Sequence, residues 1–206
     1  MIHVGVLSPV TGGFFFGEVL VGVVREVALR GGHVTLVQTL DAGQSGDAFT
    51  PSMAATAPVA FDAVDGFITI AWSTPTSYLD ELRSLGKTVV VVSNDLGEID
   101  AATVVIDNRA GVLTAVEHLV SHGHTQIGFV GNVEQSDMRE RHAAYDEGMA
   151  AQGLDAAGLF FPTQNHVEGG GRSAAPFVAA HPACTAVITT TDRVAIGLVE
   201  GLGELR

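Results

Sequence analysis

The sequence predicts an α/β fold in which helices cover both faces of doubly wound parallel sheets. Short apolar runs rich in β-branched residues alternate with amphipathic segments of helical length along all 206 residues. The run at 88–92 (TVVVV) is apolar at successive positions, which is typical of a parallel strand covered on both faces. Regular alternation of strand and helix favours the doubly wound class over all-α or all-β folds.

The elements are expected in the following order. The expected strands cover residues 3–8, 34–38, 67–71, 88–92, 104–106, 126–130, 159–161 and 186–190. Apart from the helix that follows Asp107, the expected helices cover residues 18–30, 52–61, 76–85, 138–152, 170–180 and 193–205. The helix at 18–30 has apolar residues at spacings of three and four, which predicts an inner face of Leu20, Val23, Val24 and Val27.

The stretch Val104–Val130 contains a signal at each boundary between a predicted strand and a predicted helix. It opens with three β-branched residues, as a buried strand does. Asp107 and Asn108 follow where a helix N-cap is wanted, because their side-chain oxygens can accept from free backbone N–H groups. Gly123 closes the helix, since glycine adopts the left-handed C-terminal conformation without a Cβ penalty. The apolar face of this helix is expected to be Val112, Val116, Leu119 and Val120.

Composition excludes several classes of function. The formal net charge is −13 and the ten Lys and Arg residues are scattered, which argues against nucleic-acid binding by this segment. A hydrophobic content of 47% suits a folded protein with a sizeable core, and no apolar run reaches the about 20 residues of a membrane span. Met1 leads directly into a strand without a secretory leader, and Cys184 is the single cysteine, so we expect a cytoplasmic protein.

Residues 107–130 read DN-x-A-G-x-x-x-A-x-x-H-L-x-x-x-G-H-x-x-I-G-F-V, which closely resembles the central signature of the effector-binding domain of LacI-family transcriptional regulators. The resemblance implies a two-lobed, periplasmic-binding-protein-like fold, each lobe a doubly wound parallel sheet. The first lobe would cover 1–107 and the second 108–206. The helix-turn-helix headpiece and the C-terminal part of such regulators are not found in this sequence, so we expect a fragment.

The resemblance also implies ligand contacts in the N-terminal lobe. Phe15 and Phe16 match the place where relatives put aromatics that stack on sugar or purine rings, and Ser8 begins the loop that carries them. Packing of a lid or of the lobes is the alternative. Trp72 ends a strand and is expected either to stack on a ligand or to pack at the rim of the sheet.

Two further polar residues follow the valine strand. Asn94 and Asp95 stand where a parallel strand presents groups beyond its carboxyl end, and they are candidates to bond the hydroxyls of a polyol. Capping of the next turn is the alternative.

The segment RHAAY at 141–145 matches the family's R-x-x-G-aromatic motif, with Ala144 in place of the usual glycine. Arg141 thereby aligns with the arginine that binds effector hydroxyls or carboxylates in relatives, a task that suits the five donors of a planar guanidinium. Arg139 is the other candidate. The alternative role of Arg141 is a surface salt bridge with Glu140 or Asp137.

The segment TTTDRVAIG at 189–197 matches the family's N-D-x-x-A-x-G, with Thr191 in the Asn position and Asp192 in the Asp position. Asp192 is expected to line the cleft and to cap the final helix. Asn165 and His166 lie where relatives place another cleft residue.

Metal and catalytic chemistry find little support. His118 and His122 share a helical face at i, i+4, but relatives carry the same pattern without metal, so helix-end hydrogen bonding and packing are expected. No P-loop or G-x-S-x-G motif occurs. We therefore expect no enzyme activity, no cofactor and no metal.

The resulting hypothesis is a cytoplasmic, homodimeric sensor that binds a small polar effector, a sugar or a nucleobase-like compound, between two lobes to regulate transcription. DNA would be contacted only through a headpiece outside this sequence, and no membrane contact is expected. The alternative is the sensory input domain of a signalling enzyme such as a nucleotide cyclase or kinase. The expected ligand contacts are Ser8, Phe15, Phe16, Trp72, Asn94, Asp95, Arg141, His166, Thr191 and Asp192.

Overall fold

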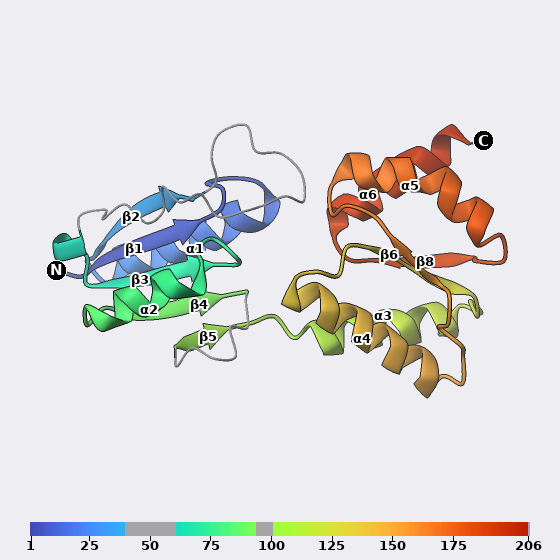
Figure 1. The fold of residues 1–206 in the computed structure, drawn as a ribbon, viewed down its shortest axis with the longest axis horizontal. Helices are drawn as coiled ribbons and strands as arrows, with labels where there is room; N and C mark the ends of the chain where they lie inside the picture. Colours follow the sequence, from blue (N-terminus) through green and yellow to red (C-terminus); the bar gives the residue numbers. More distant parts are fainter. Residues whose placement is uncertain (40–60, 94–100, 206) are drawn as a thin grey trace. The chain divides into compact units, whose positions relative to one another are not determined.

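The chain divides into two compact units, an N-terminal unit of Met1–Ile106 and a C-terminal unit of Asp107–Arg206 (Figure 1). The computed structural model describes residues 1–39, 61–93 and 101–205. Each unit has its own sheet and its own hydrophobic core. In the described part of the chain, no helix is long and apolar enough to cross a membrane.

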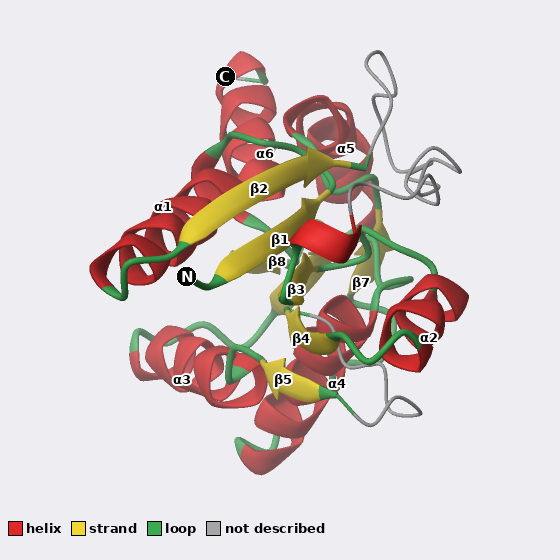
Figure 2. Cartoon of the chain, turned by 90° about the vertical axis from the view of Figure 1, so that its left-hand side faces the viewer, coloured by secondary structure: helices red, strands yellow, loops and turns green. Residues whose placement is uncertain are grey.

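The N-terminal unit is built on a five-stranded parallel sheet of order β2-β1-β3-β4-β5. Helix α1 covers one face and α2 the other (Figure 2). Because β2 and β3 lie on opposite sides of β1, the strand order changes direction there, and ligands of open α/β sheets typically bind beyond the carboxyl ends of strands at such a point. The elements are β1 (His3–Ser8), α1 (Phe14–Leu29), β2 (His33–Gln38), a 3-10 turn (Phe61–Ala63), β3 (Gly66–Ile70), α2 (Thr76–Ser84), β4 (Thr88–Val92) and β5 (Ala102–Val104).

Two apolar layers hold this unit together. Successive residues of a strand point to opposite faces, so Val6 packs towards α1 with Leu20, while Leu7 packs towards α2 with Leu79 and Leu82. All five side chains are buried. The sheet is thereby covered on both faces, as the valine run predicts.

The C-terminal unit has a three-stranded parallel sheet of order β7-β6-β8. Helices α3 and α4 cover one face, and α5 and α6 cover the other (Figure 1). The strand order again reverses at β6, which makes the carboxyl ends of β6 and β8 the typical position for a ligand in this unit. The elements are α3 (Asn108–Ser121), β6 (Ile127–Gly131), α4 (Ser136–Ala151), β7 (Phe160–Pro162), α5 (Val167–Ala180), β8 (Ala186–Thr189) and α6 (Asp192–Glu204).

Strand β6 is buried along its whole length. Phe129 faces α3 and α4, where it lies 5.2 Å from the ring of Tyr145, and Val130 faces α5 and α6 beside Phe177. The Tyr145 hydroxyl donates a 2.7 Å hydrogen bond to the Ile127 carbonyl, which satisfies the polar end of an otherwise apolar ring.

The first helix begins earlier than the sequence indicates. It starts at Phe14 instead of residue 18, with Gly13 at φ +87° and a Gly17 N–H to Gly13 carbonyl bond of 3.0 Å in its first turn. No side chain caps this end, so the sequence carries no start signal there. Val24 is predicted on the inner face but is 48% exposed. The buried side of α1 consists of Leu20 with the partly buried Phe16, Val19 and Val23.

Two other elements differ from expectation or lie outside the structure's description. Strand β5 ends at Val104, and Val105 and Ile106 continue as exposed chain instead of completing a strand at 104–106. The expected helix at 52–61 falls outside the described residues, apart from its last position in the 3-10 turn. Asp107 is confirmed as the cap of α3, since its Oδ1 accepts from the Ala110 N–H at 2.9 Å.

Helices α5 and α6 approach closely through glycines. A Cβ on Gly197 would overlap the Val167 carbonyl, and one on Gly170 would overlap the Val194 carbonyl. Gly203, also on α6, has open space around the corresponding position. The backbones of the two helices can therefore come this close only because Gly170 and Gly197 carry no side chain.

We expect Gly197→Ala to destabilise the C-terminal unit by about 1–3 kcal/mol, because the added methyl group must push two backbones apart. Gly203→Ala is the matched control and should be neutral or stabilise by up to about 1 kcal/mol through helix propensity. Urea unfolding measures both changes. Equal effects of the two substitutions would contradict the close α5–α6 contact.

Candidate functional site

Polar side chains gather at the carboxyl edge of the sheet in the C-terminal unit. Asn132 follows β6, Thr190 follows β8, and Asn165 precedes α5. The Asn165 Oδ1 accepts from the Asn132 N–H at 2.9 Å and from the Thr190 hydroxyl at 2.5 Å, and its Nδ2 donates to the Asn132 carbonyl at 3.0 Å. One amide thus ties together three loops that leave the sheet at this edge.

This edge is tightly built. Thr190 is fully buried, and Gly131 has φ +148° beside it. A side chain at Gly131 would overlap the Thr190 side chain, so only glycine fits there. The loops are therefore fixed against one another before any ligand arrives.

Arg141 reaches the same edge from α4. Its Nε donates to the Asn108 Oδ1 at 2.8 Å and its Nη1 donates to the Thr190 carbonyl at 2.5 Å. Both acceptors are uncharged oxygens, unlike the salt bridge to Glu140 or Asp137 that was the alternative role of this arginine. A guanidinium carries five N–H donors, so two such bonds fix its plane and leave donors for a ligand.

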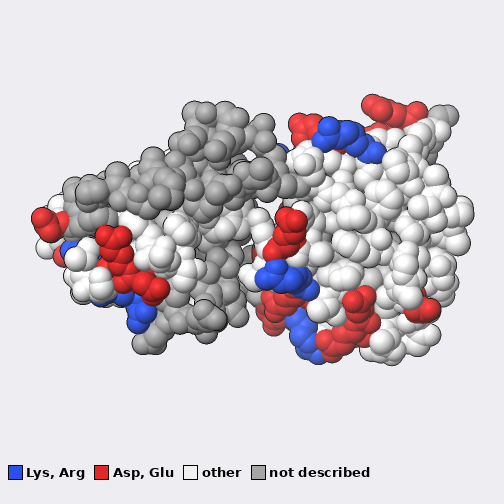
Figure 3. Space-filling view, viewed as in Figure 1, with Lys and Arg blue, Asp and Glu red and all other residues white. Residues whose placement is uncertain are grey.

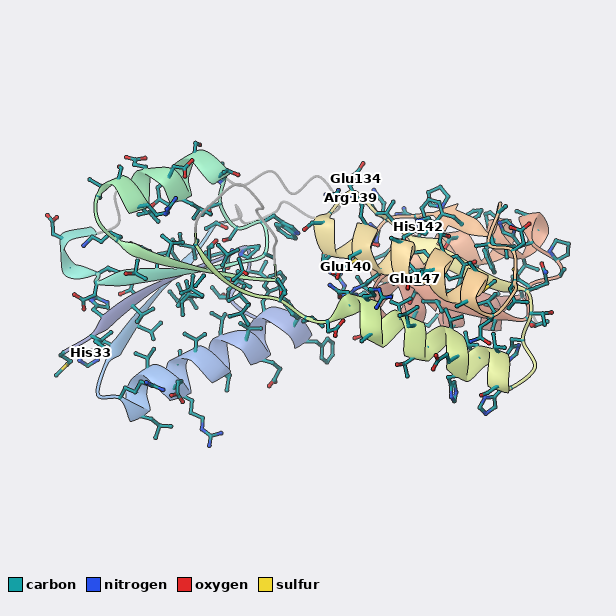
Figure 4. The ribbon with its side chains drawn as sticks, turned by 90° about the horizontal axis from the view of Figure 1, so that it is seen from below. His33, Glu134, Arg139, Glu140, His142 and Glu147 are labelled. Carbon is teal, nitrogen blue, oxygen red and sulfur yellow. The ribbon has the colours of Figure 1, made fainter. Side chains whose placement is uncertain are left out.

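Arg139, the other arginine candidate, is exposed and donates to the Glu134 carbonyl. Glu140 accepts from the Asn108 Nδ2 at 2.8 Å. About two turns further along α4, Glu147 accepts from the Arg109 Nε at 2.8 Å. Figure 4 shows both glutamates reaching from α4 towards α3.

Asp137 lies near Arg141 at the start of α4. Burial raises the pKa of its carboxyl group, and the positive charge of Arg141 and the Met138 N–H, which the Oδ1 accepts at 3.0 Å, offset only part of this rise. The site thus holds a fixed cation beside a carboxylate that ionises at a cost.

In the N-terminal unit, the structure brings together the three aromatic residues expected to stack on a ligand. The Phe16 ring lies 5.1 Å from Phe15 and 6.2 Å from Trp72, each edge to face. They lie where β1 and β3 end, and Ala71 turns the chain there with φ +53°. Phe16 also packs against the core on the α1 side of the sheet, so it contributes to the fold of this unit.

Ser8 is fully buried and its hydroxyl donates to the Val10 carbonyl at 2.6 Å. This burial disfavours direct ligand contact by Ser8. Asn94 and Asp95 lie outside the described residues.

Three expected contacts stand at helix starts. His166 is the N-cap of α5, with its Nδ1 accepting from the Gly169 N–H at 2.8 Å. Thr191 is the N-cap of α6 and accepts from the Val194 N–H at 3.4 Å. The expectation that Asp192 caps this helix is wrong: Asp192 is its first residue and is exposed, which is a favourable place for a negative charge.

Three residues of this edge were missed as site residues, namely Asn108, Asn132 and Thr190. Asn108 looked like a second capping residue, Asn132 lay in a loop without a motif, and Thr190 belongs to a run of three threonines. His122, by contrast, bonds the helix end, its Nδ1 lying 2.8 Å from the His118 carbonyl oxygen. No group of three or more potential metal ligands occurs in the part of the chain that the structure describes.

We expect Asp137→Asn to stabilise the protein at neutral pH. The raised pKa means that the ionised carboxyl group lowers the free energy of unfolding. This loss of stability is present above the ordinary pKa of about 3.9 and vanishes at lower pH, where the group is protonated in both the folded and the unfolded state. Thermal melts at pH 7 and in acid measure this. Glu117→Gln, on the exposed side of α3, is the control and should change little. A loss of stability at pH 7 in Asp137→Asn would contradict the dominance of burial.

Comparison with known proteins finds similar sequences and similar folds. A family model for the periplasmic binding protein-like domain matches residues 116–206. The chain is 29% identical over 135 residues to the HTH-type transcriptional regulator MalR of Streptomyces coelicolor, covering 61% of this chain and 38% of that protein. It is 26% identical over 143 residues to the HTH-type transcriptional regulator reg1 of Streptomyces lividans. The chain thus spans 38% of the length of these curated relatives.

Solved structures agree with the fold over nearly the whole chain. The transcription regulator CcpA of Lactococcus lactis has a TM-score of 0.82 at 19% identity, covering 99% of this chain and 73% of that one. A LacI family transcriptional regulator from Enterococcus faecium, solved with bound ribose, has a TM-score of 0.82 at 24% identity, covering 98% of this chain and 72% of that one. Residues 116–206 are therefore similar to the periplasmic binding protein-like domain, and the chain as a whole has the fold of these transcriptional regulators.

Proposed function

We propose that this chain is the effector-sensing domain of a LacI-type transcriptional regulator and that it binds a sugar through Arg141. The observation that carries the proposal is the guanidinium fixed at the carboxyl edge of the C-terminal unit by Asn108 and the Thr190 carbonyl. A rigid donor at that edge suits hydroxyl oxygens, because its orientation is set before binding. Two solved structures of the same fold, from Enterococcus faecium and Enterococcus faecalis, hold ribose.

The proposed contact set in this unit is Arg141 with the helix starts at His166, Thr191 and Asp192. Asp192 supplies an exposed acceptor, and the guanidinium supplies donors, which together match the mixed donor and acceptor character of a sugar hydroxyl. Phe15, Phe16 and Trp72 are the proposed stacking surface of the N-terminal unit. A nucleobase-like effector would use the same donors and stacking faces.

Control of transcription requires a DNA-binding segment beyond this chain. The net charge is −13, and on the face shown in Figure 3 the Lys and Arg side chains of the described residues lie beside acidic ones. Phosphate backbones need clustered positive charge, so the proposal assigns DNA contact to another part of the protein. Both curated relatives carry HTH-type regulator in their names, which supports this output over a signalling enzyme. We also propose that the regulator is a homodimer and acts in the cytoplasm.

The test is a thermal-shift and calorimetry screen of the chain with ribose, hexoses and purines. A ligand at a hundred times its Kd should stabilise the wild type by about 2.7 kcal/mol. Arg141→Ala should lose this stabilisation, because the fixed donors are gone.

Arg109→Ala is the matched control, since Arg109 is an exposed arginine of the same unit paired with Glu147. It should bind as the wild type does. Arg141→Lys, which keeps the charge without the planar fork, guards against a misfolded alanine variant. Undiminished sugar affinity in both Arg141 variants would overturn the proposal.

A further inference from the structure

Asn108 is a buried amide whose two ends both contact α4. It is the first residue of α3 and is 7% exposed. Its Oδ1 accepts from Arg141 and its Nδ2 donates to Glu140, each at 2.8 Å. Helix capping does not explain this side chain, because Asp107 already accepts from the Ala110 N–H.

The chemistry of the contact requires an amide. Arg141 needs an acceptor and Glu140 needs a donor, and an asparagine side chain provides both at once. An aspartate would accept from Arg141 but would face the Glu140 carboxylate, and an apolar residue would leave both partners without their bonds.

We propose that Asn108 is a positioning residue for the effector site. It accepts from Nε of Arg141 and so fixes the plane of the guanidinium whose remaining donors bind the ligand. Glu140 fixes the rotamer of the Asn108 amide, so that its oxygen, and not its nitrogen, faces Arg141. This inference rests on the proposed function of Arg141 and adds that ligand affinity depends on a residue that does not touch the ligand.

A second consequence concerns the chain's passage into the C-terminal unit. Asn108 is one residue past Asp107, where this unit begins. The effector arginine is thereby bonded to the first turn of the helix that follows the boundary. This bond therefore fixes Arg141 to the start of the C-terminal unit.

The first experiment measures ribose affinity in single and double variants. Asn108→Ala should weaken binding about tenfold to a hundredfold, the order found where partners that orient metal ligands are removed. In the Arg141→Ala background the same substitution should cost nothing further, because the residue it positions is gone. Arg109→Ala is the control, since it breaks the neighbouring α3–α4 bridge without reaching Arg141.

A reciprocal exchange tests the direction of the bonds. Asn108→Asp alone should weaken binding, because the new carboxylate faces Glu140. Asn108→Asp combined with Glu140→Gln keeps the total charge and restores an acceptor for Arg141 and a donor for residue 108. Affinity should therefore recover at least threefold over Asn108→Asp alone, but stay below the wild type because a carboxylate holds more of the guanidinium donors than an amide oxygen does. A general loss of structure would not be repaired by this exchange.

A spectroscopic readout works without ligand. The Arg141 Nε–H resonance should be observable and slow to exchange in the wild type, and should broaden or exchange at least tenfold faster in Asn108→Ala. It should recover in the exchanged pair.

The outcomes separate the two claims. Undiminished ribose affinity in the Arg141 variants overturns the proposed function together with this inference. Loss in Arg141→Ala with full affinity in Asn108→Ala overturns only the positioning role. An Arg141 resonance unaffected by Asn108→Ala also overturns it, whether or not ribose binds.

Discussion

The total burial of β6 is the constraint on which the C-terminal unit depends. A strand with no exposed residue must be covered on both faces, and parallel neighbours require crossover helices to do so. Helices α3 and α4 therefore pack on one side and α5 and α6 on the other. Every connection from strand to helix then leaves from the carboxyl edge, which is where polar loops can meet without disturbing the core.

Polar groups at such an edge must be satisfied by one another, because burying an unbonded polar atom costs more than one hydrogen bond returns. Asn165 solves this for the loops by bonding Asn132 and Thr190. Arg141 extends the network from Thr190 to Asn108 on α3. The network fixes the arginine as a consequence of satisfying the edge, so preorganisation of the site follows from the requirements of folding.

The sequence predicted what local patterns and motifs can encode. Strand and helix alternation, the Asp107 cap and the apolar faces of α3 were readable because periodicity and capping are local. The start of α1 was missed because Phe14 follows no capping side chain, and Thr191 was confused with Asp192 because both residue types cap helices well. The role of Asn108 depends on residues 32 and 33 positions away, and no local pattern encodes a contact of that separation.

The uncharged partners of Arg141 explain how one side chain can serve both the fold and a neutral ligand. A carboxylate in direct contact would take a pair of donors and hold the guanidinium by its charge. An amide oxygen and a carbonyl oxygen hold it by geometry and compete less strongly for its other donors. Asp137 lies nearby, and burial raises the pKa of its carboxyl group although the charge of Arg141 acts to lower it. The positive charge is therefore balanced at a distance while the donors keep the direction that the edge gives them, which suits hydroxyl groups that bring no charge of their own.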